Sequence, residues 1–284
     1  MKNTIQEWLI RANKKLTQAQ IPSANLDAEL ILSKVLSRER TYLHAKPDKK
    51  LTKQQIFHAN NWLNLRAKRV PLAYIFQEKE FYGRNFFVNN SVLVPRPETE
   101  TLIDCIKNLY IEGDIILDVG TGSGIIPISI LAEFHKNFGD NKNLEVFASD
   151  ISLSALAVAN LNAKKILNQE IPLFESDLLE KIPQGILQKI TILTANLPYV
   201  DQNWIDFSEE NELNHEPQIA LYAEDGGLDL YKKLFQQAQN LPSIKFLLIE
   251  ADPDQFQDLE DVAKNHQFRL VQKQNYTLVF EKIK

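Results

Sequence analysis

The sequence predicts an α/β protein with a doubly wound, mostly parallel sheet, a small helical bundle before it and an antiparallel hairpin at its end. Three observations predict this class. Apolar residues recur at helical spacing through the first 70 positions, short apolar strands alternate with helical segments from Ile115 onward, and two strand-like runs close the chain. Alternating strands and helices are typical of a parallel sheet covered by helices on both faces.

The first 72 residues are predicted to form the helical domain. One helix is indicated by apolar residues at helical spacing, namely Ile5, Leu9, Ala12 and Leu16. A second follows in the region 26–35. A third opens at Thr52, with Gln55 three positions later, which is a capping-box pattern.

Residues 73–95 change in character and are predicted to connect two domains. They are rich in aromatic and β-branched residues, and Gly83 and the Asn89–Asn90 pair divide them into short pieces. This pattern is typical of a β-hairpin. The third domain is then expected over 96–284, beginning with a helix from Pro97 to Tyr110.

The third domain should contain the sheet. Five apolar runs are predicted as parallel strands, at 115–119, 145–149, 171–175, 190–195 and 245–250. Helices are expected at 125–135, 152–168 and 228–240. The runs 268–272 and 276–282 flank three polar residues, so they should pair as an antiparallel hairpin.

Composition limits the function classes. A chain of 284 residues is long enough for two domains, and its only cysteine, Cys105, excludes an internal disulfide and a cysteine metal cluster. Cys105 lies on an apolar helix face and is expected in the core, and the five histidines show no ligand spacing. These features fit a reducing, cytoplasmic compartment without a bound metal.

Charge and hydropathy exclude further classes. Glu7 and Arg11 interrupt the first apolar stretch, which therefore does not read as a signal peptide, and no run approaches the roughly 20 apolar residues of a membrane span. The net charge of −5 does not favour a surface built for nucleic acid. We expect neither a membrane nor a stable nucleic acid as partner.

A glycine-rich turn follows the first strand of the sheet. It consists of Gly120, Thr121, Gly122, Ser123 and Gly124. Glycines permit positive φ and close approach of a ligand, although a plain strand-to-helix turn would look similar. The nicotinamide fingerprint requires a glycine where Ile125 stands, so the turn suits a cofactor without a pyrophosphate.

Acidic residues follow the next two strands. Asp150 can accept hydrogen bonds from two ribose hydroxyls, or it can cap the following helix. Asp177 and Leu178 follow the third strand, where an adenine ring would rest, although Leu178 could equally be a core residue. Together with the motif LDVGTGSG, these strand ends resemble those of methyltransferases that use S-adenosyl-L-methionine, a resemblance that implies a Rossmann-like sheet.

The fourth strand ends in Asn196, Leu197, Pro198 and Tyr199, which resembles the (D/N)PP(Y/F) motif of amino-methylating enzymes. The side-chain oxygen of Asn196 and the carbonyl of Leu197 could accept both hydrogens of a planar NH2 group, and the Tyr199 ring could stack on it. Pro198 stiffens the turn. Asn196 is also expected to border the cofactor. Leu197 replaces the usual first proline, so the turn should be less rigid.

Longer segments resemble one family. Residues 69–104, the motifs LDVGTGSG and ANLPYV, and residues 216–234 are similar to the PrmC/HemK family. Its members use S-adenosyl-L-methionine to methylate the amide nitrogen (N5) of the glutamine in the Gly-Gly-Gln loop of class-1 peptide chain release factors. The resemblance implies that release factors are the partners and that the helical domain helps to bind them.

Other interpretations stay open. A glutamine of a ribosomal protein would require the same chemistry, and a nucleic-acid amino-methyltransferase would use the same motif on a base. The Leu197 change also permits a binding module that has lost catalysis. Arg96 and Glu98 could border the pocket or simply begin a helix, and Glu216–Pro217 could form a lid wall before a turn at Gly226 and Gly227.

Overall fold

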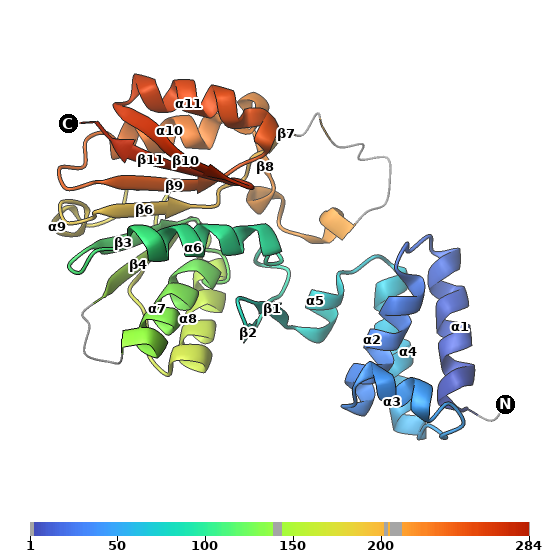
Figure 1. Cartoon of the computed structure of the whole chain (residues 1–284). Coiled ribbons are helices and arrows are strands. Elements are labelled where there is room, and N and C mark those ends of the chain that lie inside the picture. The colour runs from blue at the N-terminus through green and yellow to red at the C-terminus, as the bar shows by residue number, and fades with distance from the viewer. Residues whose placement is uncertain (1–2, 139–143, 202–203, 205–211, 284) are drawn as a thin grey trace. The chain divides into compact units, whose positions relative to one another are not determined.

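The computed structural model describes residues 3–138, 144–201, 204 and 212–283. It divides the chain into two compact units, and each is described by itself (Figure 1). Unit 1 comprises Met1–Gln77 with Glu209–His215, and unit 2 comprises Glu78–Ser208 with Glu216–Lys284.

Unit 1 is helical, as predicted. Its elements are α1 (Ile5–Gln18), α2 (Ala24–Leu36), α3 (Arg40–Ala45), α4 (Lys53–Ala67), α5 (Leu72–Phe76) and the 3-10 turn η3 (Glu212–His215). The capping box predicted for Thr52 and Gln55 is confirmed at the start of α4. The core is built from the apolar stripes of α1, α2 and α4, with Trp8 fully buried among them. A buried ion pair, Arg66 Nε to Asp27 Oδ2 at 2.6 Å, joins α4 to α2.

Unit 2 contains the predicted sheet. Its strands are β3 (Ile115–Val119), β4 (Glu145–Asp150), β5 (Leu173–Glu175), β6 (Ile192–Ala195), β9 (Phe246–Glu250), β10 (Phe268–Gln274) and β11 (Thr277–Lys282). They form one seven-stranded sheet in the order β10-β11-β9-β6-β3-β4-β5. The five strands from β9 to β5 are parallel, whereas β11 is antiparallel to both β9 and β10. The fold class and the C-terminal hairpin are therefore confirmed.

Helices cover both faces of this sheet (Figure 1). One face packs against α6 (Glu100–Leu109), α7 (Ile125–Phe138) and α8 (Leu153–Leu167), and the other against α10 (Asp229–Ala238) and α11 (Phe256–Asn265). Cys105 of α6 is buried, as expected. Parallel strands buried on both faces read as continuous apolar runs, which is why the sequence predicted them.

Short elements complete unit 2. The connector contains the predicted hairpin, formed by β1 (Lys79–Phe81) and β2 (Arg84–Phe86). Two short strands, β7 (Val200–Asp201) and β8 (Tyr222–Ala223), pair in parallel. The remaining elements are α9 (Gln184–Leu187) and the 3-10 turns η1 (Pro97–Thr99), η4 (Gln218–Ala220), η5 (Asp225–Gly227) and η6 (Pro253–Gln255). Among the described residues, no helix has the length and apolar content needed to cross a bilayer.

Candidate functional site

A cavity of about 430 Å³ opens at the carboxyl ends of β3, β4, β5 and β6. This is the edge where parallel α/β sheets bind ligands, and the volume suits a small molecule. Ten of the predicted site residues line it, namely Gly120, Thr121, Gly122, Ser123, Asp150, Asp177, Leu178, Asn196, Leu197 and Pro198. Gly124 and Tyr199 are not among the lining residues. The sheet therefore brings together four strand ends that are far apart in the sequence.

The backbone conformation of the glycine turn brings it to the edge of the cavity. Gly120 and Gly122 both have positive φ, at 73° and 55°. A Cβ added at Gly120 would lie 2.9 Å from Leu197 Cδ2, so the turn packs directly against the end of β6. The amides of Gly120 and Thr121 donate to the Ser149 carbonyl, both at 2.9 Å. These N–H groups are already satisfied within the protein.

Gly124 serves helix packing. A Cβ at this position would lie 2.8 Å from Ile128 Cδ1 and 3.2 Å from the Ala159 Cβ of α8. Only glycine allows α7 and α8 to approach so closely here. The sequence had placed Gly124 with the cofactor-binding residues, a role that stays a prediction.

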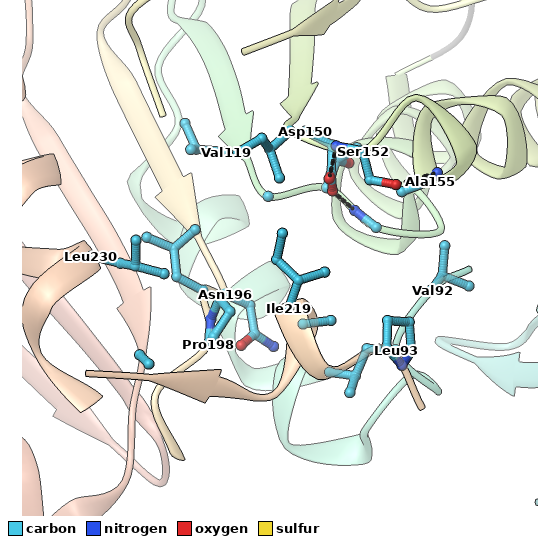
Figure 2. A pocket seen from close by; sticks show the side chains of 18 of the residues that line it. Val92, Leu93, Val119, Asp150, Ser152, Ala155, Asn196, Pro198, Ile219 and Leu230 are labelled. Atoms are coloured by element: carbon cyan, nitrogen blue, oxygen red, sulfur yellow. Dashed lines mark hydrogen bonds between the residues drawn. The ribbon is translucent and has the colours of Figure 1, made fainter. Parts of the chain in front are cut away.

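Asp150 joins the glycine turn to the start of α8 (Figure 2). Its Oδ2 accepts from the Gly122 amide and its Oδ1 from the Ser152 amide, both at 2.9 Å. The N-cap of α8 is Ser152, whose hydroxyl accepts from the Ala155 amide. Burial raises the pKa of Asp150, although these backbone donors oppose the shift. Each carboxylate oxygen keeps a further acceptor position, so two ligand hydroxyls can still bind.

The loop after β5 supplies Asp177 and Leu178. Leu178 has φ of 49°, a left-handed conformation that costs a leucine energy, and its side chain lines the cavity. Strain of this kind is often found where a structure presents a side chain to a ligand. Leu178 also belongs to the core cluster of unit 2, so both interpretations of this residue hold.

Asn196 stands at the end of β6, across the cavity from Asp150 (Figure 2), and Leu197 follows it among the lining residues. The Asn196 Nδ2 donates to the Thr99 hydroxyl at 3.1 Å. The Leu197 amide donates to the Tyr231 hydroxyl at 3.2 Å, a bond that proline could not make. This bond offsets part of the rigidity lost with the first proline of the motif.

Glu250 ends β9 and lies beside this loop. It is 1% exposed, and burial raises its pKa to about 7, although the nearby polar groups of Thr99, Asn196 and Tyr199 oppose the shift. Tyr199 packs against the core cluster, with its hydroxyl 3.5 Å from Glu250 Oε1. Burial and the charge of Glu250 also raise the pKa of Tyr199, which stays neutral.

Arg96 and the segment after Glu216 also line the cavity. Glu216 is buried, and it accepts from the Arg96 guanidinium at 2.7 Å and from the Val94 amide at 2.9 Å. Pro217 and Ile219 of this segment line the cavity. The ion pair explains why a charged residue can be buried at this position.

Sequence reasoning missed Thr99, Glu250 and Tyr231. Glu250 had a signal, because it is an acid at the end of an apolar strand, like Asp150. Thr99 lies inside the segment 69–104 that resembles the family, yet nothing local distinguishes its hydroxyl. Tyr231 has no signal in the sequence, because its partners lie 34 and 19 positions away.

Two family descriptions match the chain. Residues 7–76 match the PrmC N-terminal domain, and residues 97–272 match the methyltransferase small domain. The first match lies within unit 1. The second spans the sheet from before β3 into β10.

Named relatives cover most of the chain. It is 35% identical over 237 residues to a release factor glutamine methyltransferase of Koribacter versatilis, covering 82% of this chain and 81% of the relative. It is 33% identical over 280 residues to a bifunctional methyltransferase of Rickettsia felis, covering 87% of this chain and 51% of the relative. The chain thus spans about half the length of that relative.

A solved structure shares the fold. It is described as the hMettl16 catalytic domain in complex with the MAT2A 3′UTR hairpin 1. The TM-score is 0.54 at 13% identity, over 89% of this chain and 90% of that one. At this identity the likeness concerns the fold alone.

The cavity fits S-adenosyl-L-methionine, the cofactor of this methyltransferase family. Gly122 borders the cavity with no protein atom within 4 Å of an added Cβ, Asp150 offers carboxylate oxygens at a ribose position, and Leu178 adds an apolar surface for a ring. The chain is therefore an S-adenosyl-L-methionine-dependent methyltransferase, and it belongs to the PrmC family, which includes proteins named release factor glutamine methyltransferase.

Proposed function

We propose that the protein methylates the side-chain amide nitrogen (N5) of the glutamine in the Gly-Gly-Gln loop of class-1 peptide chain release factors. The observation that carries this proposal is the shared lining of one cavity. Asp150 and the glycine turn border it at the ends of β3 and β4, while Asn196 and Leu197 border it at the end of β6. The name of the Koribacter versatilis relative supports the substrate class.

The residues at the end of β6 have the chemistry that an amide acceptor requires. A carboxamide nitrogen is a weak nucleophile because its lone pair is delocalised into the carbonyl. The Asn196 Oδ1 and the Leu197 carbonyl would accept from both hydrogens of the substrate NH2 group, which orients the nitrogen and favours positive charge on it. The bound cofactor supplies a methyl group on a sulfonium, which is a good leaving group.

Positioning supplies most of the rate in this scheme. Holding two reactants in line can lower the activation barrier by up to roughly 7–11 kcal/mol. The proton can leave the nitrogen after methyl transfer, so no general base is required. Stacking of the Tyr199 ring on the amide stays a prediction. The helical unit, which matches the PrmC N-terminal domain, is proposed to contact the release factor.

The test offers radiolabelled S-adenosyl-L-methionine and three acceptors to the purified protein: a class-1 release factor, ribosomes and DNA. We expect label on the release factor alone, on the loop peptide, and none on a release factor whose loop glutamine is alanine. Label on ribosomal protein or DNA instead would contradict the proposal. No label on any of the three would favour a binding module.

Asp150→Ala is expected to weaken cofactor binding. Each hydrogen bond lost between the carboxylate and a ribose hydroxyl should cost about 1.5–3 kcal/mol, because one partner is charged. Titration calorimetry with S-adenosyl-L-methionine measures the change, and Asp258→Ala, on the exposed side of α11, removes the same charge elsewhere. Unchanged affinity in the Asp150 variant would limit this residue to holding the turn.

A further inference from the structure

The charges of the chain are distributed unevenly along it. Residues 1–77 contain fourteen lysines and arginines against five aspartates and glutamates, a formal charge of +9, whereas the whole chain carries −5. Residues 78–284 therefore carry −14. The three glutamates of Glu209–His215 lower the formal charge of unit 1 only to +6. An acidic chain thus contains one strongly basic unit.

The surface of unit 1 is more basic than this balance indicates, because two of its acids are buried. Asp27 and Glu29 are both 4% exposed, and each pairs with an arginine at 2.6 Å. Among the described residues of the unit, the exposed acids are Glu39 and Asp48, whereas every described lysine of the unit is exposed. A partner that approaches this unit therefore meets mainly positive charge.

Five exposed cations lie in and beside α3 and the loop that follows it. We call them the basic cluster, which consists of Arg38, Lys46, Lys49, Lys50 and Lys53. Lys49 Nζ donates to the Tyr42 hydroxyl at 2.8 Å, and Arg38 Cζ lies 5.6 Å from the centre of the Tyr42 ring. The Lys49 hydrogen bond lowers the pKa of Tyr42, and the charges of Lys49, Arg38 and Lys46 act in the same direction. Positive charge is thus concentrated around one tyrosine.

Fold stability does not explain the basic cluster. The loop is held by its backbone, because the Ile5 amide donates to the Lys49 carbonyl at 3.0 Å and the Leu51 amide donates to the Asn3 carbonyl at 2.9 Å. Lys53 is the first residue of α4, where a positive charge is unfavourable beside the positive end of the helix dipole. A role in binding accounts for cations at such a position.

We propose that the basic cluster of unit 1 binds an acidic face of the protein substrate and steers that substrate to the enzyme. This inference rests on the proposed function in naming a release factor as the substrate. Charge complementarity of this kind raises association rates by roughly 10–10³-fold. It contributes more to the rate of encounter and to the choice of partner than to the final affinity.

An acidic protein fits the basic cluster better than RNA does. Four of its five cations are lysines, whereas arginine is the residue that binds phosphate groups in a bidentate manner. The ring of Tyr42 is already in contact with Arg38 and Lys49, so it is not left to stack on a base. The charge of −14 on residues 78–284 also opposes the binding of a long polyanion.

Charge reversal in the full-length protein tests the inference. The variant combines Lys46→Glu, Lys49→Glu and Lys53→Glu. At low ionic strength we expect it to lower kcat/KM for the release factor by roughly tenfold or more, with unchanged kcat and unchanged affinity for S-adenosyl-L-methionine. The same three positions changed to Gln should give a smaller loss, because the charges are removed without being reversed.

Salt and a matched control separate the basic cluster from net charge. Added salt should bring the wild-type kcat/KM toward that of the reversed variant, because the Debye length falls to about 3 Å at 1 M ionic strength. The control combines Lys165→Glu, Lys181→Glu and Lys189→Glu, three exposed lysines of unit 2, and should behave as the wild type. An equal loss in this control, or a wild-type kcat/KM in the cluster variant, would show that the inference is wrong.

A fluorescent single-stranded RNA tests the competing partner. RNA binding that is lost in the cluster variant, with unchanged methylation of the release factor, would assign the cluster to RNA and overturn the inference. The two proposals also fail separately. Methylation of the release factor that is independent of the cluster would contradict this inference alone. Methylation of a different acidic protein, with the expected dependence on the cluster and on salt, would contradict the proposed function alone.

Discussion

Asn196→Ala is expected to abolish measurable methyl transfer to the proposed substrate, a release factor, while cofactor binding changes little. Truncation removes the Oδ1 acceptor that orients the substrate nitrogen and stabilises the charge developing on it. Removing one preorganised hydrogen-bonding group of this kind lowers kcat by about 10²–10³-fold. The measurement pairs single-turnover transfer with calorimetric titration of S-adenosyl-L-methionine.

The control for this variant is Asn240→Ala, which truncates an exposed asparagine whose side chain bonds only to the Gln236 carbonyl in the described contacts. It should match the wild type in both assays. Equal loss of transfer and of cofactor affinity in Asn196→Ala would mean that Asn196 serves the cofactor rather than the amide.

Gly227→Ala should destabilise unit 2 severely. Gly227 has φ of 82°, and an added Cβ would lie 2.0 Å from the Tyr199 carbonyl oxygen and 2.3 Å from Gln255 Nε2. Gln255 holds this loop by donating to the carbonyls of Tyr199, at 2.8 Å, and Gly226, at 2.7 Å. Overpacking and backbone strain together should cost about 3 kcal/mol or more.

Gly226→Ala is the matched comparison, because it isolates the strain. Gly226 also has positive φ, at 68°, but no atom lies within 4 Å of its added Cβ. The expected loss is about 1–2 kcal/mol, the usual penalty for a left-handed residue. Urea denaturation of both variants measures the difference. Equal losses would mean that the loop moves away from the added methyl group without cost.

Predictions from local sequence patterns succeeded where local chemistry decides the structure. The capping box of α4 depends on two side chains three positions apart, and the strand ends depend on apolar runs that stop at polar residues. The helix α11 escaped prediction although Phe256, Leu259 and Ala263 have helical spacing. The short helices α3 and α5 have too few turns for periodicity to identify them.

The site is held together by contacts between residues that are far apart in the sequence, and no local pattern predicts such contacts. Tyr231 belongs to α10, yet its hydroxyl binds the loop after β6. Glu250 is 54 positions from Asn196 in the sequence, and it becomes a neighbour only because β9 pairs with β6. The ion pair of Arg96 with Glu216 likewise joins segments 120 positions apart.

By itself, the sequence determined the class of sheet, the four strand ends that border the cavity, and the residues that follow β6. These features follow from apolar periodicity and from the residue types at each strand terminus, which are properties of short segments. Only the tertiary structure decided how Asn196 is oriented, how Leu197 is held without its proline, and which buried acid lies beside them. The order of strands in the sheet sets these contacts, and that order minimises the free energy of the whole domain rather than of any segment.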